Sequence, residues 1–141
     1  MAADLTLRII TPSAIVLDTT VSAVRVPAVD GSMGVLSRHA AMITALDVGL
    51  LSYTAGGEER TIFVSGGFAE VRENTVRVVS EAGERPADID EARAKEAERR
   101  ARERLDEARA ARGKSDIDIV RAEAALRRAL LRQKVRGSGR G

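Results

Sequence analysis

The sequence of 141 residues contains no cysteine, so it can form neither a disulfide framework nor a thiolate metal site, and it has no cysteine nucleophile. Its single histidine, His39, cannot build a multi-histidine zinc site. Aromatic residues make up 2% of the chain, and tryptophan is absent. This scarcity leaves few side chains to stack on bases and disfavours the common RNA-binding modules.

Long apolar runs are also missing. No stretch approaches the roughly 20 apolar residues that a membrane-spanning helix requires. The N-terminal residues 1–5 lack the basic and apolar regions of a signal peptide. These features predict a soluble, intracellular protein, and the length predicts one domain, or a small domain with an appendage.

The net charge of +2 conceals an asymmetry along the chain. Residues 1–85 carry 7 Lys and Arg against 10 Asp and Glu, whereas residues 86–141 carry 16 against 11. Composition changes at the same point, from Val, Ile, Leu, Thr and Gly to Ala, Arg and Glu. We therefore predict two units, 1–85 and 86–141, that meet near Pro86. The basic half is either a solvated helical face or a surface that attracts phosphate.

The first unit has the pattern of an antiparallel β-sandwich or barrel. Leu5, Leu7 and Ile9 alternate with polar residues, which is typical of a half-buried strand. About nine short strands follow one another between turns, with no helical period among them, and Pro27 is expected to end the third. The pair Gly56-Gly57 predicts a hairpin turn, because glycine adopts positive φ without steric cost.

The second unit predicts two helices joined by a short loop at residues 113–115. Asp88 is a candidate N-cap for the first helix, with Glu91 as its capping-box partner, and Ser115 or Asp116 is a candidate cap for the second. One narrow apolar face of the first helix consists of Ala94, Ala97, Ala101, Leu105 and Ala108. The corresponding face of the second consists of Ile119, Ala122, Leu126, Ala129 or Leu130, and Gln133. Residues 137–141 are expected to fray.

The fold class is therefore α+β, an N-terminal antiparallel β-sandwich followed by a C-terminal antiparallel helical hairpin. An interface built mostly of alanine buries few methylenes, each contributing roughly 0.8 kcal/mol. A hairpin held by a few kcal/mol can be opened by a ligand or partner, because reversing a 1:99 equilibrium takes roughly 5.5 kcal/mol. The alternatives are a permanently closed hairpin and a long helix docked elsewhere.

No catalytic constellation is visible, since His39 has only Ser37 nearby and nothing supplies a relay. The carboxylates Glu58, Glu59, Glu70 and Glu73 lie at turns and are expected to face solvent. We therefore expect that this chain has no catalytic residues of its own and no metal site.

Three blocks resemble the epsilon subunit of bacterial F-type ATP synthase. Residues 29–40, Val-Asp-Gly-Ser-Met-Gly-Val-Leu-Ser-Arg-His-Ala, are similar to one family signature. Residues 65–71, Ser-Gly-Gly-Phe-Ala-Glu-Val, with 74–78, resemble a second, and residues 88–94 resemble the start of the family's C-terminal helices. Their order and spacing cover the chain from about Leu5 to Gln133.

The resemblance implies a non-catalytic rotor subunit in the central stalk of an ion-translocating ATP synthase, peripheral to the cytoplasmic face of the bacterial membrane. The sandwich would bind the gamma subunit and the c-ring, and so couple rotation to ATP synthesis. The helices would either extend into the alpha and beta subunits and inhibit ATP hydrolysis, or fold back as a hairpin. The coupling ion is not encoded in this chain.

Some family members bind ATP through an I/L-D-x-x-R-A motif, which Ile89, Asp90, Arg93 and Ala94 match. The supporting family positions fall on Glu84, Arg100, Arg121 and Arg128. Folding about Lys114 would place Arg100 level with Arg128, since each lies 14 residues away. Arginine suits phosphate oxygens, so ATP is expected as a regulatory ligand and no other cofactor is required. The alternative is that Asp90 and Arg93 form an ordinary helix pair.

Two positions depart from the family pattern. Ser37-Arg38 replaces the usual Pro-Gly before His39, and Ser32 stands where an acidic residue is frequent. The resemblance assigns Ser32, Met33, Gly34 and His39 to the gamma and c-ring interface.

Two other functions remain open. The serious rival is a purely structural rotor connector without regulatory switching. The other is a basic helical module that binds nucleic acid, although 11 interspersed acidic residues and the lack of aromatics weigh against nucleic acid as a partner.

Overall fold

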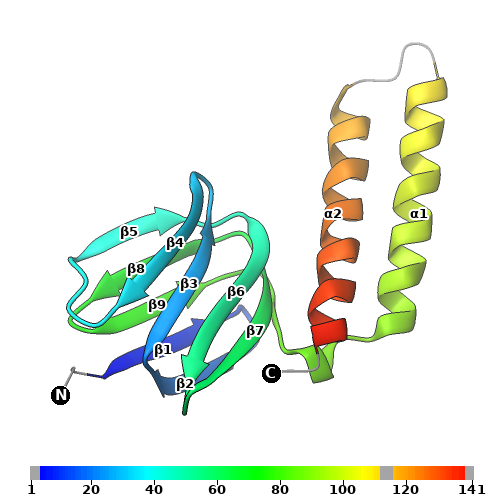
Figure 1. Ribbon diagram of the computed structural model, residues 1–141. Helices are drawn as coiled ribbons and strands as arrows, with labels where there is room; N and C mark the ends of the chain where they lie inside the picture. Colours follow the sequence, from blue (N-terminus) through cyan, green and yellow to red (C-terminus); the bar gives the residue numbers. More distant parts are fainter. Residues whose placement is uncertain (1–3, 112–115, 139–141) are drawn as a thin grey trace.

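The computed structural model describes residues 4–111 and 116–138, which form a β-sandwich and a helical hairpin (Figure 1). One sheet contains β2 (Ile15–Val21), β1 (Leu5–Ile10), β9 (Thr75–Val79), β8 (Phe68–Arg72) and β5 (Met42–Ala45), in that order. The other contains β10 (Gly83–Glu84), β7 (Glu58–Ser65), β6 (Val48–Ala55), β3 (Ala23–Ala28) and β4 (Gly31–Leu36). After a 3₁₀ turn (Pro86–Asp88) come α1 (Glu91–Ala110) and α2 (Asp116–Ser138).

The predicted sandwich is confirmed, and its pairs are antiparallel with one exception. β1 and β9, the first and ninth strands, pair in parallel from Thr6↔Thr75 to Ile10↔Val79. The structure adds a tenth strand, β10, to the nine expected. β3 continues through Pro27, which was expected to end it. By Pro27 the ladder between β3 and β6 has ended at Arg25, so the missing N–H interrupts no bond to β6.

Alternation along the strands builds the sandwich core. Leu5, Leu7 and Ile9 are at most 1% exposed and face the other sheet with their apolar neighbours. Gly56 and Gly57 have φ values of 58° and 79°, as the predicted hairpin turn requires. At Gly67, φ is 92° and an added Cβ would lie 1.9 Å from the carbonyl oxygen of Val79. Only glycine fits this turn.

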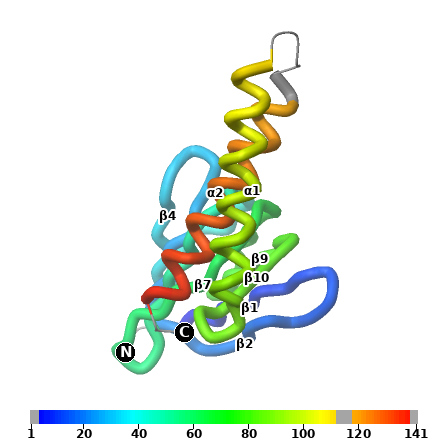
Figure 2. The backbone as a smooth tube through the Cα atoms, turned by 90° about the vertical axis from the view of Figure 1, so that its right-hand side faces the viewer, coloured from blue at the N-terminus to red at the C-terminus, as the bar shows by residue number. Residues whose placement is uncertain are grey.

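A second apolar cluster docks the hairpin onto the sandwich. Phe63, Ile89 and Val135 are buried together, and Leu50 and Leu131 pack against them. Phe63 lies on the outer face of β7, so this strand is covered on both faces, and Ile62, Phe63 and Val64 are all fully buried. In Figure 1, α2 runs between the sandwich and α1. Figure 2 shows the distal ends of both helices rising beyond the sheets.

The two helices pack through small residues. Ala94, Ala101 and Ala108 of α1 are buried at intervals of seven, and so are Ala122 and Ala129 of α2. These positions belong to the predicted faces, and of the two alternatives Ala129 and Leu130 it is Ala129 that is buried, whereas Leu130 is 41% exposed. Gly137 and Ser138, expected to fray, belong to α2. The expected cap Ser115 and the expected pivot Lys114 lie outside the described residues.

Candidate functional sites

The start of α1 differs from the sequence prediction. Asp90, not Asp88, is the N-cap, and its Oδ1 accepts a hydrogen bond from the Arg93 backbone N–H at 3.0 Å. Pro86 begins a separate 3₁₀ turn that contains Asp88, and Ile89 is extended and buried before the α-helix begins. Glu91 consequently pairs with Lys95 at 3.2 Å and takes no part in a capping box with Asp88.

A polar cavity of about 340 Å³ lies at the base of the hairpin. Six of the eight residues predicted to bind nucleotide line it together, and Asp88, Ala97 and Arg132 complete it; the six are Glu84, Ile89, Asp90, Arg93, Ala94 and Arg100. Three parts of the chain contribute: β10 with the following turn, the first turns of α1, and the C-terminal part of α2. A ligand in this cavity would therefore contact the sandwich and both helices.

The arginines of this cavity differ in how they are paired. Arg132 Nε donates to Glu84 Oε2 at 2.7 Å, and its guanidinium lies 4.5 Å from the centre of the Phe63 ring. Arg100 is 3.5 Å from Glu96. Within the described part of the chain, the Arg93 guanidinium forms no ion pair. Arg93 is thus the cation best placed to accept an anionic ligand without first losing a partner.

Arg121 and Arg128 do not reach this cavity. Arg121 lines a different hollow of about 310 Å³ toward the far end of the hairpin, with Arg104 and Asp118. Contacts between the helices explain why. Gln133 donates to Glu98 at 2.8 Å and Arg109 pairs with Glu123 at 3.5 Å, which places Arg100 level with the turn containing Arg132.

Besides Asp88 and Ala97, the motif analysis missed Arg132, which is the α2 residue of the cavity. It lies four residues beyond Arg128 and therefore on the same face of α2, one turn nearer the sandwich. Counting 14 residues on either side of Lys114 predicted that Arg128 lies level with Arg100, which is wrong by about one helical turn. Gln133 could have indicated the correct alignment of the two helices. It is a polar residue on the apolar face of α2, and it pairs with Glu98 of α1.

The side-chain bonds across the hairpin also affect the carboxylates on α1. The hydrogen bond from Gln133, together with that from Arg102, lowers the pKa of Glu98 below the ordinary glutamate value. A hydrogen bond from Arg99 lowers the pKa of Glu96 in the same way. Hydrogen bonds from these donors therefore favour the charged form of both carboxylates.

The four residues assigned to a partner interface lie at the far edge of the sandwich. Ser32, Met33 and Gly34 belong to β4, the edge strand opposite β10 in the same sheet, and His39 follows in the loop to β5. Ser32 and Gly34 are exposed, whereas Met33 and His39 are half-buried. Arg25 lies over this strand and donates from Nη1 to Ser32 Oγ at 3.3 Å.

The loop before His39 has Ser37-Arg38 where Pro-Gly was expected, and the structure shows how Arg38 is accommodated. Arg38 adopts a left-handed φ of 65°, and its N–H donates to Asn74 Oδ1 at 2.6 Å. His39 Nδ1 lies 2.7 Å from the Ala40 carbonyl oxygen. The side chain of Asn74 thus fixes a backbone conformation that usually favours glycine.

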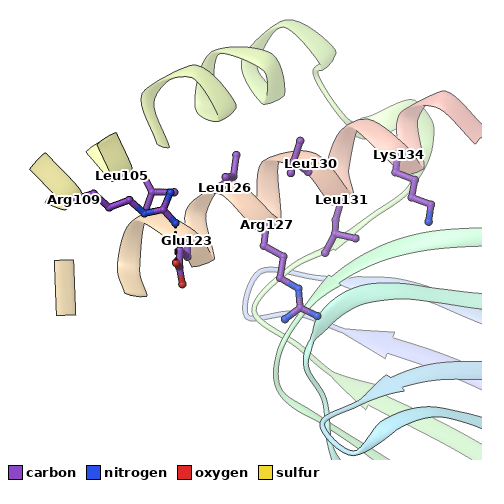
Figure 3. A pocket seen from close by; sticks show the side chains of 8 residues that line it. All are labelled: Leu105, Arg109, Glu123, Leu126, Arg127, Leu130, Leu131 and Lys134. Atoms are coloured by element: carbon purple, nitrogen blue, oxygen red, sulfur yellow. Dashed lines mark ion pairs between the residues drawn. The ribbon is translucent and has the colours of Figure 1, made fainter. Parts of the chain in front are cut away.

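A second, apolar groove of about 440 Å³ runs along the hairpin (Figure 3). Its floor consists of Leu105, Leu126, Leu130 and Leu131. Its rim carries the cations Arg109, Arg127 and Lys134 and the carboxylate of Glu123, which pairs with Arg109. Arg127 also reaches Asp47 on the sandwich at 3.1 Å. The sequence pattern placed Leu126, and Leu130 as an alternative to Ala129, between the helices, so it did not predict this groove.

Comparison with known proteins identifies the family. The family model described as "ATP synthase, Delta/Epsilon chain, beta-sandwich domain" matches residues 4–86. The model described as "ATP synthase, Delta/Epsilon chain, long alpha-helix domain" matches residues 87–137. The chain belongs to the ATP synthase delta/epsilon chain family.

Curated relatives in this family are named ATP synthase epsilon chain, and two of them match at nearly full length. The protein from Symbiobacterium thermophilum is 48% identical over 137 residues, covering 96% of this chain and 95% of that protein. The protein from Nitratidesulfovibrio vulgaris strain DP4 is 46% identical over 138 residues, covering 98% and 99%. The resemblance to epsilon subunits inferred from the sequence is confirmed.

Solved structures share the fold of the family. A chain in the cryo-EM structure of Euglena gracilis mitochondrial ATP synthase, OSCP/F1/c-ring, aligns with a TM-score of 0.75 at 23% identity, covering 92% of this chain and 79% of that chain. A chain in the Tetrahymena thermophila mitochondrial ATP synthase central stalk and c-ring structure aligns with a TM-score of 0.60 at 13% identity, covering 96% and 98%. No helix within the described ranges is both long and apolar enough to cross a membrane.

Proposed function

We propose that this epsilon-family chain is a rotor subunit that joins the gamma subunit to the c-ring and carries rotation between them without bond-making chemistry of its own. Membership of the family supports this assignment, as does the shared fold with chains from central-stalk and c-ring structures. The exposed edge strand β4, with Ser32 and Gly34, offers a contact surface for a rotor partner. Such a subunit would sit at the cytoplasmic face of the membrane as a peripheral part of an ion-transporting complex.

The apolar groove suits a second contact with gamma. Its leucine floor fits a partner surface with an apolar centre. Its rim carries Lys134 and two arginines that are already paired, Arg109 with Glu123 and Arg127 with Asp47. The groove lies on the hairpin and β4 lies at an edge of the sandwich, so the two surfaces consist of different residues.

We also propose that the polar cavity binds ATP and that bound ATP keeps the hairpin docked. The observation that carries this proposal is that β10, α1 and α2 all line the cavity. A ligand that bridges three elements stabilises only the state in which they are together. Without ligand, the helices would extend toward the alpha and beta subunits and inhibit ATP hydrolysis.

Calorimetric titration with millimolar Mg-ATP tests the ligand. We expect heat of binding from the full chain, and about tenfold weaker affinity or more for Arg93→Ala, because charged hydrogen bonds contribute about 1.5–3 kcal/mol. Arg121→Ala is the matched control, since it removes an arginine that lies outside the cavity. Absence of heat, or equal effects of the two variants, would refute the cavity as the ATP site.

The rotor assignment has a separate test. Full-length chain and a chain of residues 1–85 are mixed with the gamma subunit of the same organism, and ATP hydrolysis by the reconstituted complex is then measured. Binding of both, with faster hydrolysis for the shorter chain, supports a rotor subunit with inhibitory helices. Binding with equal rates supports the purely structural connector, and absence of binding contradicts both.

A further inference from the structure

The two helices of the hairpin have very different sequences. α1 consists only of Glu, Ala, Arg, Lys, Leu and Asp, with no glycine, proline or β-branched residue over 20 positions. All of these except Asp are strong helix formers. α2 contains the β-branched Ile117, Ile119, Val120 and Val135 and ends near Gly137. These residues lie near the two ends of α2, whereas residues 121–134 between them are strong helix formers. Local preference therefore favours α1 over α2 chiefly at the ends of α2.

Side-chain contacts within α1 strengthen this difference. Three glutamates lie four residues before a basic partner, the favoured orientation of such pairs: Glu91–Lys95 at 3.2 Å, Glu96–Arg100 at 3.5 Å and Glu98–Arg102 at 2.9 Å. Arg99 additionally bridges Glu96 and Glu103. Asp90 caps the first turn and Arg109 lies in the last, so both ends complement the helix dipole.

The ion pairs of α2 instead run to other elements. Arg127 pairs with Asp47 and Arg132 with Glu84, both on the sandwich side, while Gln133 bonds to Glu98 of α1. Val135 is fully buried against the sandwich cluster. Across the part of α2 that the structure describes, no ion pair joins two side chains of the helix itself.

We propose that α1 is a self-supporting helix that persists when the hairpin opens, whereas α2 is helical only while it is docked. Opening then converts the hairpin into a rigid rod of about 30 Å, 20 residues at 1.5 Å each, followed by a segment free to fold on a partner. This inference concerns the chain alone and holds whether or not the cavity binds ATP.

The test opens the hairpin in the full-length chain without altering α1. Ala122 and Ala129 are 4% and 1% exposed, and arginine fits neither position in a closed hairpin. Arginine is itself a good helix former, so Ala122→Arg with Ala129→Arg does not lower the local preference of α2. Circular dichroism at 222 nm then reports the total helix content, and hydrogen exchange with mass spectrometry reports each helix separately.

We expect the double variant to lose the ellipticity of the 23-residue α2 and to keep that of the 20-residue α1. Amides of α2 should exchange at the rate of an unstructured chain, while those of α1 remain several-fold slower. Loss of protection in both helices would overturn the proposal, because α1 would then depend on α2. Retention of protection in α2 would overturn it as well, because α2 would not need docking.

A second comparison tests the cause. In the opened variant, Glu96→Gln with Glu103→Gln removes the partners of Arg99 and should lower α1 protection at least twofold. Asp106→Asn with Glu107→Gln is the matched control: it removes the same charge from the same helix and no ion pair among the described residues. Equal effects of the two pairs would contradict support by the local ion pairs.

Discussion

Arg132 offers the sharpest test of how α2 is held against the sandwich. Its side chain joins α2 to Glu84 of β10 and to the Phe63 ring of β7, and both Arg132 and Glu84 are about 30% exposed. We consider Arg132→Gln, which removes the cation and keeps a polar side chain of moderate length. The change leaves the Glu84 carboxylate half-buried without its partner.

The expected magnitude follows from these contacts. A cation over an aromatic face contributes about 0.5–1 kcal/mol at an exposed site. An ion pair that retains this much solvent contact contributes about 1 kcal/mol or less, well below the value for a buried pair. The sum is about 1.5 kcal/mol, which corresponds to roughly a tenfold increase in the undocked population of α2.

Hydrogen exchange of the amides in residues 130–138 measures that population. We expect roughly tenfold faster exchange there in Arg132→Gln, with exchange in β1 and β9 unchanged. Arg128→Gln is the matched control, one turn earlier on the same helix and outside the cavity. Adding Glu84→Gln to Arg132→Gln should cause little further change, because the pair is already broken. Unchanged exchange in Arg132→Gln would refute the role of this contact in docking.

Three further predictions concern stability. Gly67→Ala should lower the free energy of unfolding by about 2 kcal/mol or more, measured by urea denaturation, and more than Gly57→Ala, because only the former meets a carbonyl oxygen at 1.9 Å. Asp90→Ala should cost about 1 kcal/mol by loss of the N-cap; an unchanged urea midpoint would contradict this. Because the pKa values of Glu96 and Glu98 are lowered in the folded chain, their stabilisation is complete above the ordinary value of 4.5 and is lost as pH falls through the lower folded values. Helix ellipticity should thus stay constant from about pH 7 to 5 and decline below about pH 4; a decline already near pH 6 would refute the assignment.

Much of the sandwich could be predicted because its signals are local. Strict alternation at Leu5, Leu7 and Ile9 and the turn residues Gly56 and Gly57 encode strands and a hairpin without reference to distant residues. The parallel pairing of β1 with β9 has no such signal, since it joins residues some 70 positions apart. The continuous burial of Ile62, Phe63 and Val64 depends on a helix docking on the outer face of β7, which alternation within one strand cannot reveal.

The candidate cavity was predictable in part for the same reason. Glu84, Ile89, Asp90, Arg93 and Ala94 are close in sequence, so a short motif finds them together. Which residue of α2 lines the cavity depends on how α2 is aligned along α1. That alignment is set by contacts such as Glu98–Gln133, and shifting it by one turn exchanges Arg128 for Arg132.

The places of β4 and β10 at opposite edges of one five-stranded sheet have a consequence for how this chain can change over time. Four strand spacings of about 4.8 Å set the β4 surface roughly 19 Å from Glu84, with three hydrogen-bonded strands between β10 and β4. Substitutions that retune the hairpin therefore need not disturb the contacts made by β4. If β4 and the hairpin have the separate roles proposed above, each surface can acquire substitutions without altering the other.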